Sequence, residues 1–255
     1  MRKKIRYKSN NGLKFEFSDK APYFAEKIDA ASISGEFSVD TLAGTVGQFT
    51  TSKSLSGRTI TCEFAVVFNT YEMRLFKKQI IERLIECFNP TVSGTITIIT
   101  DTGDYEIECY PAEIPKFDNS EVSFVYRFTV DFICDYPYFC NTKKHKIMLE
   151  AEKTKIIKTQ SIINIPFKII IENFSGLTLT NNTTKKELRL KPFGGGGVIY
   201  DTKTLTFTTK YGQDASQFID ITSDFDEFYL KYGNNELISN ANIEIVYQNY
   251  ALGVI

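Results

Sequence analysis

Alternation of apolar and polar residues dominates the chain and predicts a protein built mainly of β-strands. Near the N-terminus, Ile5 and Tyr7 alternate with polar neighbours, and the alternation resumes further on through Phe17. Between the two runs lies Asn11-Gly12, a pair that readily adopts the positive φ angles of a tight hairpin turn. This stretch therefore predicts an opening β-hairpin.

Two later segments carry the same signal. Thr95–Thr100 and Tyr105–Tyr110 alternate on either side of the turn-forming sequence Asp101-Thr-Gly-Asp104, which predicts a second hairpin. The segment Val122–Cys134, VSFVYRFTVDFIC, places an apolar residue at every second position. As one strand it would be roughly 40 Å long at about 3.3 Å per residue. We expect it to bend or to extend beyond its own domain.

One segment has the spacing of an amphipathic helix, at about residues 70–88. In YEMRLFKKQIIERLIECFNP the apolar residues recur every three or four positions: Met73, Phe76, Ile80, Ile81, Leu84, Ile85 and Phe88. Asn69 is the predicted cap, with Glu72 reaching back to it, and Pro90 ends the helix. A single helix among many strands favours a stripe buried against a sheet over a partner-binding helix.

The segment from about residue 35 to 58, GEFSVDTLAGTVGQFTTSKSLSGR, is predicted to be an extended arm. It is rich in Gly, Ser and Thr but also contains Phe37, Val39, Leu42, Val46, Phe49 and Leu55. A disordered linker would lack such apolar residues. A long extended loop or arm that packs on something else would keep them.

The pattern changes near residue 140, where polar and basic residues precede a series of short strand-like runs. Among the predicted strands are 167–171, 177–180, 187–190, 198–200, 205–207, 218–221, 228–230 and 243–247. Many short strands with frequent turns favour a β-sandwich. We therefore predict an N-terminal β domain over residues 1–140, a linker or first strand region over 141–160 and a sandwich over 161–255.

Composition supports the β class and limits the function classes. The chain has 21 Phe and 14 Tyr but no Trp, and a formal net charge of −1. That charge disfavours a nucleic-acid binder held by phosphate neutralisation. The basic start MRKKIRYK is followed by no apolar run, which predicts folding in a cytoplasm without membrane insertion. Five cysteines lack CxxC spacing: Cys62, Cys87, Cys109, Cys134 and Cys140. Four of them lie in apolar or alternating segments, which predicts free core thiols rather than disulfides or a metal site.

Four consecutive glycines, Gly194–Gly197, are the one feature that suggests a phosphate-binding loop. Such a loop requires Lys and Ser or Thr directly after its last glycine, and then a helix. Here the strand-like sequence Val198-Ile-Tyr-Asp201 follows instead. The glycines therefore predict a connection between two strands.

No constellation of residues predicts catalysis. His145 is the only histidine and lies in the basic sequence Lys143-Lys-His-Lys146, which predicts a solvated linker. The carboxylate pair Asp101/Asp104 flanks a hairpin turn. The sequence Asp224-Phe-Asp-Glu227 has the composition of a cation site or an acid/base pair, but an acidic turn is the favoured interpretation. We predict no catalytic residue, no cofactor and no metal, and hence no enzyme.

Four segments together resemble the distal tail proteins (Dit) of long-tailed bacteriophages. They are the arm with its following strand, AGTVGQFTTSKSLSGRTITCEF; the helix with the hairpin TITIITDTGDYEIECY; the strand end DFICDYPYF; and VIYDTKTLTF with FYLKYGNNELISNANIEIVYQNY. The resemblance covers nearly the whole chain, and the order and spacing of the segments carry it. Gly194–Gly197 match no motif of this family.

The resemblance implies a structural protein at the tail tip of a virion, assembled in the host cytoplasm. Its N-terminal domains would form a homo-hexameric ring, and galectin-like sandwiches would project outwards. The tail tube protein would lie above and the tail-associated hub protein below, with a receptor-binding protein as a further partner. DNA would pass through the lumen only in transit, and no membrane or cofactor is implied.

Six arm residues are the predicted subunit contacts of such a ring. We hypothesise that apolar side chains bury against an adjacent subunit or the tube while two glycines allow close backbone approach: Phe37, Leu42, Gly44, Val46, Gly47 and Phe49. Core packing within one subunit is the alternative for the apolar residues. A carbohydrate-binding or receptor-binding module of the tail tip is the alternative function, although the lack of Trp weakens it. A cell-wall hydrolase would need a pocket with a perturbed carboxylate, which the sequence does not indicate.

Overall fold

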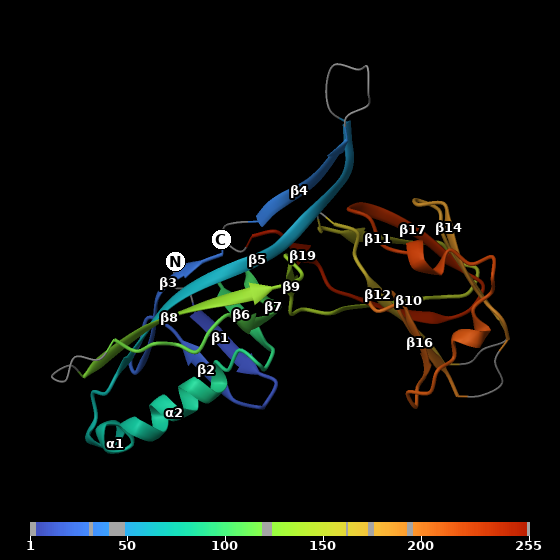
Figure 1. The fold of residues 1–255 in the computed structure, drawn as a ribbon. Coiled ribbons are helices and arrows are strands. Elements are labelled where there is room, and N and C mark those ends of the chain that lie inside the picture. The colour runs from blue at the N-terminus through green and yellow to red at the C-terminus, as the bar shows by residue number, and fades with distance from the viewer. Residues whose placement is uncertain are drawn as a thin grey trace. The chain divides into compact units, whose positions relative to one another are not determined.

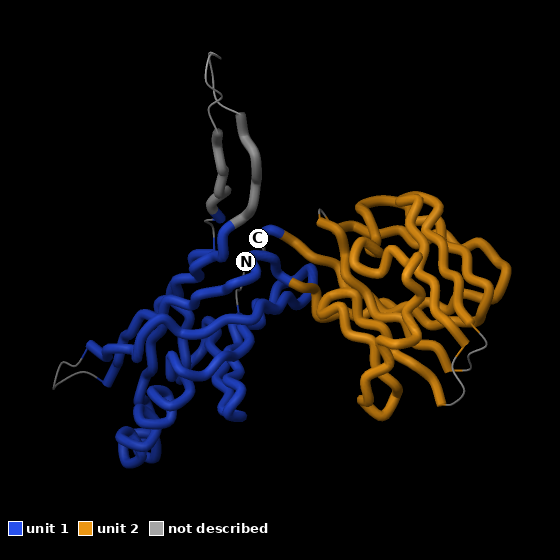
Figure 2. The backbone as a smooth tube through the Cα atoms, turned by 45° about the vertical axis from the view of Figure 1, so that its right-hand side comes forward, with its two compact units in different colours: residues 1–139, 252–255 blue, residues 140–251 orange. Residues whose placement is uncertain are grey.

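The chain folds into two compact units, Met1–Phe139 with Leu252–Ile255 and Cys140–Ala251 (Figures 1 and 2). This computed structural model describes residues 4–30, 33–40, 49–118, 124–161, 163–172, 176–192 and 196–253, and only the backbone within 34–55. Antiparallel strands dominate both units, so the predicted mainly β class is confirmed.

The first unit is a curled antiparallel sheet with a helical segment. Its strands are β1 (Lys4–Ser9), β2 (Lys14–Phe17), β3 (Tyr23–Asp29), β4 (Ile33–Asp40), β5 (Phe49–Val67), β6 (Gly94–Thr100), β7 (Gly103–Pro111) and β8 (Val125–Cys134). The main path through the sheet is β2-β1-β6-β7-β8-β5-β3, and β4 pairs with β5. The short strand β9 (Phe139–Asn141) pairs with β7 and with β19 (Tyr250–Ala251).

Both predicted hairpins are confirmed. Strands β1 and β2 pair with Ile5 opposite Phe17, and Gly12 in the turn has a φ of +94°. Strands β6 and β7 pair along their full length, and Thr100 lies opposite Gly103 at the turn. In each hairpin the predicted alternation places one set of side chains in the core.

The strand that extends beyond the main sheet is β5 (Phe49–Val67). The prediction had given this property to Val122–Cys134. Strand β8 has 10 residues, Val125–Cys134, and residues 119–123 lie outside the described part of the chain. Strand β5 has 19 residues. Its first half is rich in Ser, Thr and Lys, so it lacks the apolar alternation that marks a strand with one buried face. It pairs there with β4 instead of covering the core.

The predicted helix is two helices, α1 (Tyr71–Leu75) and α2 (Lys77–Cys87), and its cap was predicted wrongly. Thr70, not Asn69, accepts the capping hydrogen bond, from the backbone N–H of Met73 at 3.2 Å. Phe76 leaves the helical conformation and is 48% exposed. Helix α1 packs on the core through the partly buried Met73 but buries no residue fully, whereas α2 buries Leu84 and Cys87. Neither helix of the described chain has the length and apolarity to cross a bilayer.

An aromatic cluster fills the core of the first unit. Phe88, at the end of α2, is fully buried and stacks on Tyr7 with ring centroids 5.2 Å apart. Phe17 of β2 stacks on Phe64 of β5 at 4.1 Å. Because Phe88 also contacts Phe64, at 6.1 Å, the end of the helix joins the two halves of the curled sheet. Such aromatic pairs contribute about 0.5–1.5 kcal/mol each beyond their buried area.

The second unit contains two antiparallel sheets. The order of the first is β10-β18-β12-β15-β16, and the order of the second is β11-β17-β13-β14. Their bounds are β10 (His145–Leu149), β11 (Lys155–Thr159), β12 (Phe167–Ile171), β13 (Leu177–Asn181), β14 (Lys186–Leu190), β15 (Val198–Asp201), β16 (Thr206–Thr209), β17 (Gly233–Ser239) and β18 (Ile243–Tyr247). In β12 and β13 alternate residues are buried, as expected for two sheets that share an apolar interior.

Two of the predicted strands of the second unit are not strands. Residues 216–218 form the 3₁₀ turn η1 (Ser216–Phe218), and the chain beyond it makes a single bridge, Ile219 to Leu190. A second turn, η2 (Phe225–Glu227), precedes the single bridge of Leu230 to Ile165. Apolar residues in these segments pack on the sheets without joining a ladder, and an apolar pattern alone does not distinguish the two cases.

The glycine run connects β14 to β15 and therefore crosses from one sheet to the other, as a strand connection should. Gly194 and Gly195 lie outside the described residues. Gly197 has a φ of +83°, and a Cβ added there would lie 2.8 Å from the carbonyl oxygen of Ile171. Glycine at this position is thus required by backbone conformation and by close approach to β12.

Candidate functional site: the arm and its anchor

The predicted arm is a two-stranded hairpin in its described part. Strand β4 pairs with the first half of β5, from Asp40 opposite Phe49 to Ile33 opposite Arg58. The ladder contains two register shifts, which are typical of bulged and twisted strands. From Arg58 to Val67, β5 continues without interruption as a strand of the sheet and pairs with β8 (Figure 1). The arm and the core of the first unit therefore share one continuous strand.

The predicted contact residues lie on this hairpin or in the segment that joins its strands. Four of the six are outside the described residues: Leu42, Gly44, Val46 and Gly47. Phe37 of β4 pairs with Lys53, and Phe49 is the first residue of β5. For these two the backbone alone is described. Their role in subunit contact remains a prediction.

Arg58 lies where the arm joins the sheet and is almost fully buried, with 2% of its surface exposed. One guanidinium N–H donates to the carbonyl oxygen of Ala30 at 3.2 Å, and a second donates to that of Leu252. The guanidinium carbon lies 4.8 Å from the ring centre of Phe139. The chain leaves the first unit at Phe139 and returns to it at Leu252. One side chain thus fastens the base of the arm to both of these points.

The charge of Arg58 has no carboxylate partner within the described residues, and its Nε has no hydrogen-bond acceptor there. Burial lowers the pKa of the Arg58 guanidinium from its ordinary value, although an arginine remains charged in proteins. Two carbonyl dipoles and an aromatic face offset part of the cost of this burial.

Arg58 as an anchor was missed in the sequence, but a signal for it is present. Arg58 is in phase with Ile60, Cys62 and Phe64, which alternate along β5 and are all fully buried. A charged residue in phase with a buried run predicts a buried charge. Since buried charges require specific partners, such a position indicates a structural junction.

Four of the five cysteines are core residues, as predicted. All five are free, and all except Cys140 are buried. Burial raises the pKa of the Cys87 thiol to about 12 and raises that of Cys62 as well. At neutral pH these sulfurs are protonated and are neither nucleophiles nor ready metal ligands.

His145 belongs to a strand rather than to the predicted solvated linker. It begins β10, opposite Tyr247 of β18, and its ring stacks on that of Tyr247 with centroids 4.9 Å apart. The Nε2 atom lies 3.4 Å from the side-chain nitrogen of Asn249. No Ser, Cys or carboxylate is recorded in hydrogen-bond contact with this ring among the described residues. The ring therefore has a packing role in the sheet.

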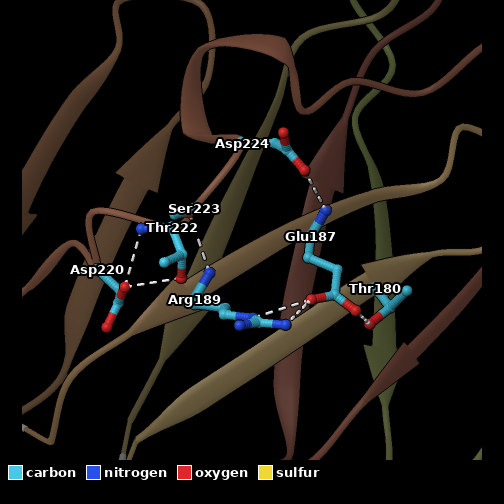
Figure 3. A network of polar contacts seen from close by, with 7 residues as sticks. All are labelled: Thr180, Glu187, Arg189, Asp220, Thr222, Ser223 and Asp224. Atoms are coloured by element: carbon cyan, nitrogen blue, oxygen red, sulfur yellow. Dashed lines mark hydrogen bonds and ion pairs between the residues drawn. The ribbon is translucent and has the colours of Figure 1, made fainter.

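The acidic sequence at 224–227 is a structural turn that holds strand β14, which agrees with the favoured interpretation (Figure 3). Asp224 accepts a hydrogen bond from the backbone N–H of Glu187 at 3.0 Å. This bond is the largest cause that lowers the Asp224 pKa, so the carboxylate is ionised at neutral pH and does not serve as a general acid. Lys186 forms ion pairs with both Asp224 and Glu227.

The same network continues along the turn. Asp220 accepts from the backbone N–H of Thr222 at 2.9 Å, and Ser223 accepts from the backbone N–H of Arg189 at 3.0 Å (Figure 3). Arg189 in turn pairs with Glu187 on its own strand. These polar groups satisfy one another and the backbone. Over the described part of the chain, no three His, Cys, Asp or Glu side chains are grouped as a metal site.

Comparison with solved structures identifies the fold. The chain is similar to the Dit (gp 19.1) protein of SPP1, described as a paradigm of the hub adsorption apparatus of phages that infect Gram-positive bacteria. The TM-score is 0.74 at 19% identity, over 97% of this chain and 99% of that one. It is also similar to a chain of the phage P2 baseplate in its activated conformation, with a TM-score of 0.55 at 10% identity over the full length of both chains.

No protein-family model and no curated protein sequence matches the chain. At sequence identities of 19% and 10%, the structural matches establish that the fold is shared and establish nothing about function. They extend over both units and nearly the whole of both chains, as does the resemblance drawn from the sequence. The chain therefore has the fold of a phage distal tail protein, and its resemblance to that family is confirmed in three dimensions.

Proposed function

We propose that this chain is a structural component of a phage tail tip, a distal tail protein that joins the tail tube to the tail-tip hub or baseplate. The observation that carries the proposal is the match to SPP1 Dit over nearly the full length of both chains. A match confined to one unit would support only a shared module. The buried, protonated thiols and structural carboxylates favour an adaptor over an enzyme.

In the proposed assembly, copies of the chain close into a hexameric ring around a channel that DNA crosses in transit. Ring closure repeats one heterologous interface around an axis, so modest contacts add up through symmetry. The tail tube protein would contact one side of the ring and the hub protein the other, with a receptor-binding protein as a further partner. The near-neutral charge of the chain suits a channel through which DNA moves without being held.

The mass of the purified particle in solution tests this proposal. We expect light scattering to give six copies of the 29.1 kDa chain, and electron microscopy of intact tails to place a ring of these copies at the tip. A chain that stays monomeric at every concentration, and that tails do not contain, would contradict the proposal.

The arm is proposed to supply part of the subunit contact. Replacing Leu42 and Phe49 together with aspartate should leave a folded chain of lower oligomeric order, because a charge in a buried apolar contact is costly. Light scattering measures the mass, and far-UV circular dichroism measures the fold. The matched control is Ile221→Asp in the second unit, where Ile221 is 97% exposed and the substitution should change neither. An unchanged oligomer for the arm variant would reject the assignment.

A groove on the first sheet of the second unit supports a carbohydrate-binding or receptor-binding role as the second candidate. Two adjoining cavities, of about 420 and 410 Å³, share two lining residues. These are Ile170, which lies in β12, and Glu172, which directly follows that strand. This volume is in the range of ordinary ligand sites, but the lining of both is aliphatic and charged rather than aromatic. Binding of the full chain on a glycan array would favour this candidate, and loss of that binding on Ile170→Asp would locate it.

A further inference from the structure

Two buried cysteines lie on neighbouring strands of the first unit, β7 and β8. These strands pair directly at two positions: Tyr110–Ile133 and Pro111–Phe132. Continued by one residue, the same register places Cys109 opposite Cys134. Both cysteines are free, and their exposed fractions are 3% and 0%. The two thiols therefore share the buried face of the sheet.

The backbone hydrogen bonds show which kind of cross-strand pair this is. The N–H of Ala112 donates to the carbonyl oxygen of Asp131 at 2.7 Å, so these two residues form a hydrogen-bonded pair. Hydrogen-bonded and non-hydrogen-bonded pairs alternate along an antiparallel ladder. Cys109 and Cys134, three positions further on, are thus a non-hydrogen-bonded pair. Such pairs have Cα atoms about 4.5 Å apart, which lies within the range of about 4.4–6.8 Å that a disulfide requires.

The two thiols also affect each other, whereas the other core cysteines are out of line with them. Burial raises the pKa of the Cys109 thiol, and the neighbouring Cys134 raises it further. Cys62 of β5 is aligned with a residue four positions before Cys134 on β8. Cys87 belongs to helix α2. The fold therefore brings one particular pair of cysteines into the position for a bond.

A buried cation adjoins this pair. Arg58 of β5 lies opposite Cys134 on the other side of β8. Burial lowers the pKa of the Arg58 guanidinium, and the neighbouring Cys134 raises it. A cation next to a cysteine stabilises the thiolate, which is the form that attacks a disulfide. Cys134 is therefore the thiol at which oxidation begins.

The pair lies at the shortest ladder of the main path through this sheet. The step from β7 to β8 has two aligned pairs, against seven between β6 and β7 and ten between β5 and β8. This step joins the half formed by β2, β1, β6 and β7 to the half formed by β8, β5 and β3. A short ladder opens locally more readily than a long one, and such opening admits an oxidant to buried thiols. A bond at this seam between β7 and β8 would hold the two halves together.

We propose that Cys109 and Cys134 close into a disulfide when the chain meets a thiol oxidant such as oxidised glutathione, and that this bond fastens β7 to β8. The Cys134 thiolate attacks the oxidant, forms a mixed disulfide and releases one glutathione. Cys109 then loses its proton and displaces the second glutathione from Cys134. Two protein thiols are oxidised, one oxidised glutathione is reduced, and the two cysteine protons end on the two glutathione thiols. The inference does not depend on the proposed ring.

Mass spectrometry of the full chain tests the inference. One sample of folded chain is equilibrated with reduced and oxidised glutathione. A second is unfolded in urea and refolded in the same mixture, which bypasses the opening of the seam. We expect the loss of two hydrogens, three of the five thiols left for blocking, and a cross-linked peptide that contains Cys109 and Cys134. Exchange of the Ala112 amide should slow by about tenfold or more in the oxidised chain, because the bond suppresses local opening.

Three variants control the assignment. Cys109→Ala and Cys134→Ala should each abolish the bond, whereas Cys62→Ala, at an equally buried position of the same core, should retain it. Circular dichroism shows whether each variant is folded, and where one is not, the peptide map of the natural chain decides alone. A bond between Cys109 and Cys134 in either sample supports the inference. Five free thiols in both samples, or a bond between other cysteines, would overturn it. Neither result bears on the proposed ring, which the mass of the particle tests.

Discussion

Replacement of Phe88 by alanine is expected to lower the free energy of unfolding of the first unit by about 3–5 kcal/mol. Phe88 is fully buried at the end of α2, and its ring lies within 6.2 Å of the centres of five other aromatic rings. Truncation would leave a cavity among large rigid rings that cannot close around it. It would also release the end of the helix from the sheet.

The matched control is Phe76→Ala, at the junction between α1 and α2, where the ring is 48% exposed. For this variant the free energy of unfolding should fall by less than about 1 kcal/mol, because the substitution removes little packed surface. Calorimetry of the full chain measures both variants, and the transition of the second unit serves as an internal reference. The chain has no Trp, so circular dichroism is the suitable optical probe. Equal effects of the two substitutions would contradict the described seating of α2.

The sequence predicted those parts of the fold in which local pattern and tertiary packing agree. The hairpin at Asn11-Gly12 is an example, since the turn residues fix the register and the apolar residues fix the buried face. The cysteines in apolar segments are another, since burial follows from their neighbours. In such places a short window of sequence contains all the physical causes of the structure.

Other parts of the fold depend on contacts with residues that lie far away in the sequence. The first half of β5 is a strand because β4 pairs with it, although Ser, Thr and Lys give it little apolar pattern. The helix breaks at Phe76, where the backbone leaves the helical conformation, and the regular spacing of apolar residues does not reveal this break. His145 appeared to belong to a basic linker because its stacking partner, Tyr247, lies a hundred residues further along the chain.

The base of the arm shows the same limit for the candidate site. Arg58 is in phase with the buried residues of β5, but the carbonyl groups that accept its hydrogen bonds, those of Ala30 and Leu252, lie 28 and 194 residues away in the sequence. The predicted contact residues of the arm, by contrast, were selected for apolarity alone, and their test remains the mass of the particle.

The second large effect is expected for Arg58→Ala, which should lower the free energy of unfolding of the first unit by about 2–4 kcal/mol. The substitution removes hydrogen bonds to two carbonyl groups, and bonds made by charged donors contribute about 1.5–3 kcal/mol each. The carbonyl oxygens of Ala30 and Leu252 would lose their donor, and the ring of Phe139 would lose its cation. Arg58→Lys should also be destabilising, because an ammonium group does not reproduce the planar fork that reaches both carbonyls.

The control for this prediction is Arg127→Ala on the neighbouring strand β8. Arg127 pairs with Glu26 at 3.0 Å, but its side chain is 60% exposed, so the loss should stay below about 1 kcal/mol. Amide hydrogen exchange over residues 250–252 gives a second readout, since loss of the hydrogen bond to the Leu252 carbonyl should speed exchange of this segment in the Arg58 variants and leave it protected in the control. If the Arg58 variants are less stable but the segment stays protected, then Arg58 stabilises only the base of the arm. If stability is unchanged, the buried guanidinium is not an anchor, and another contact must join the arm to the sheet.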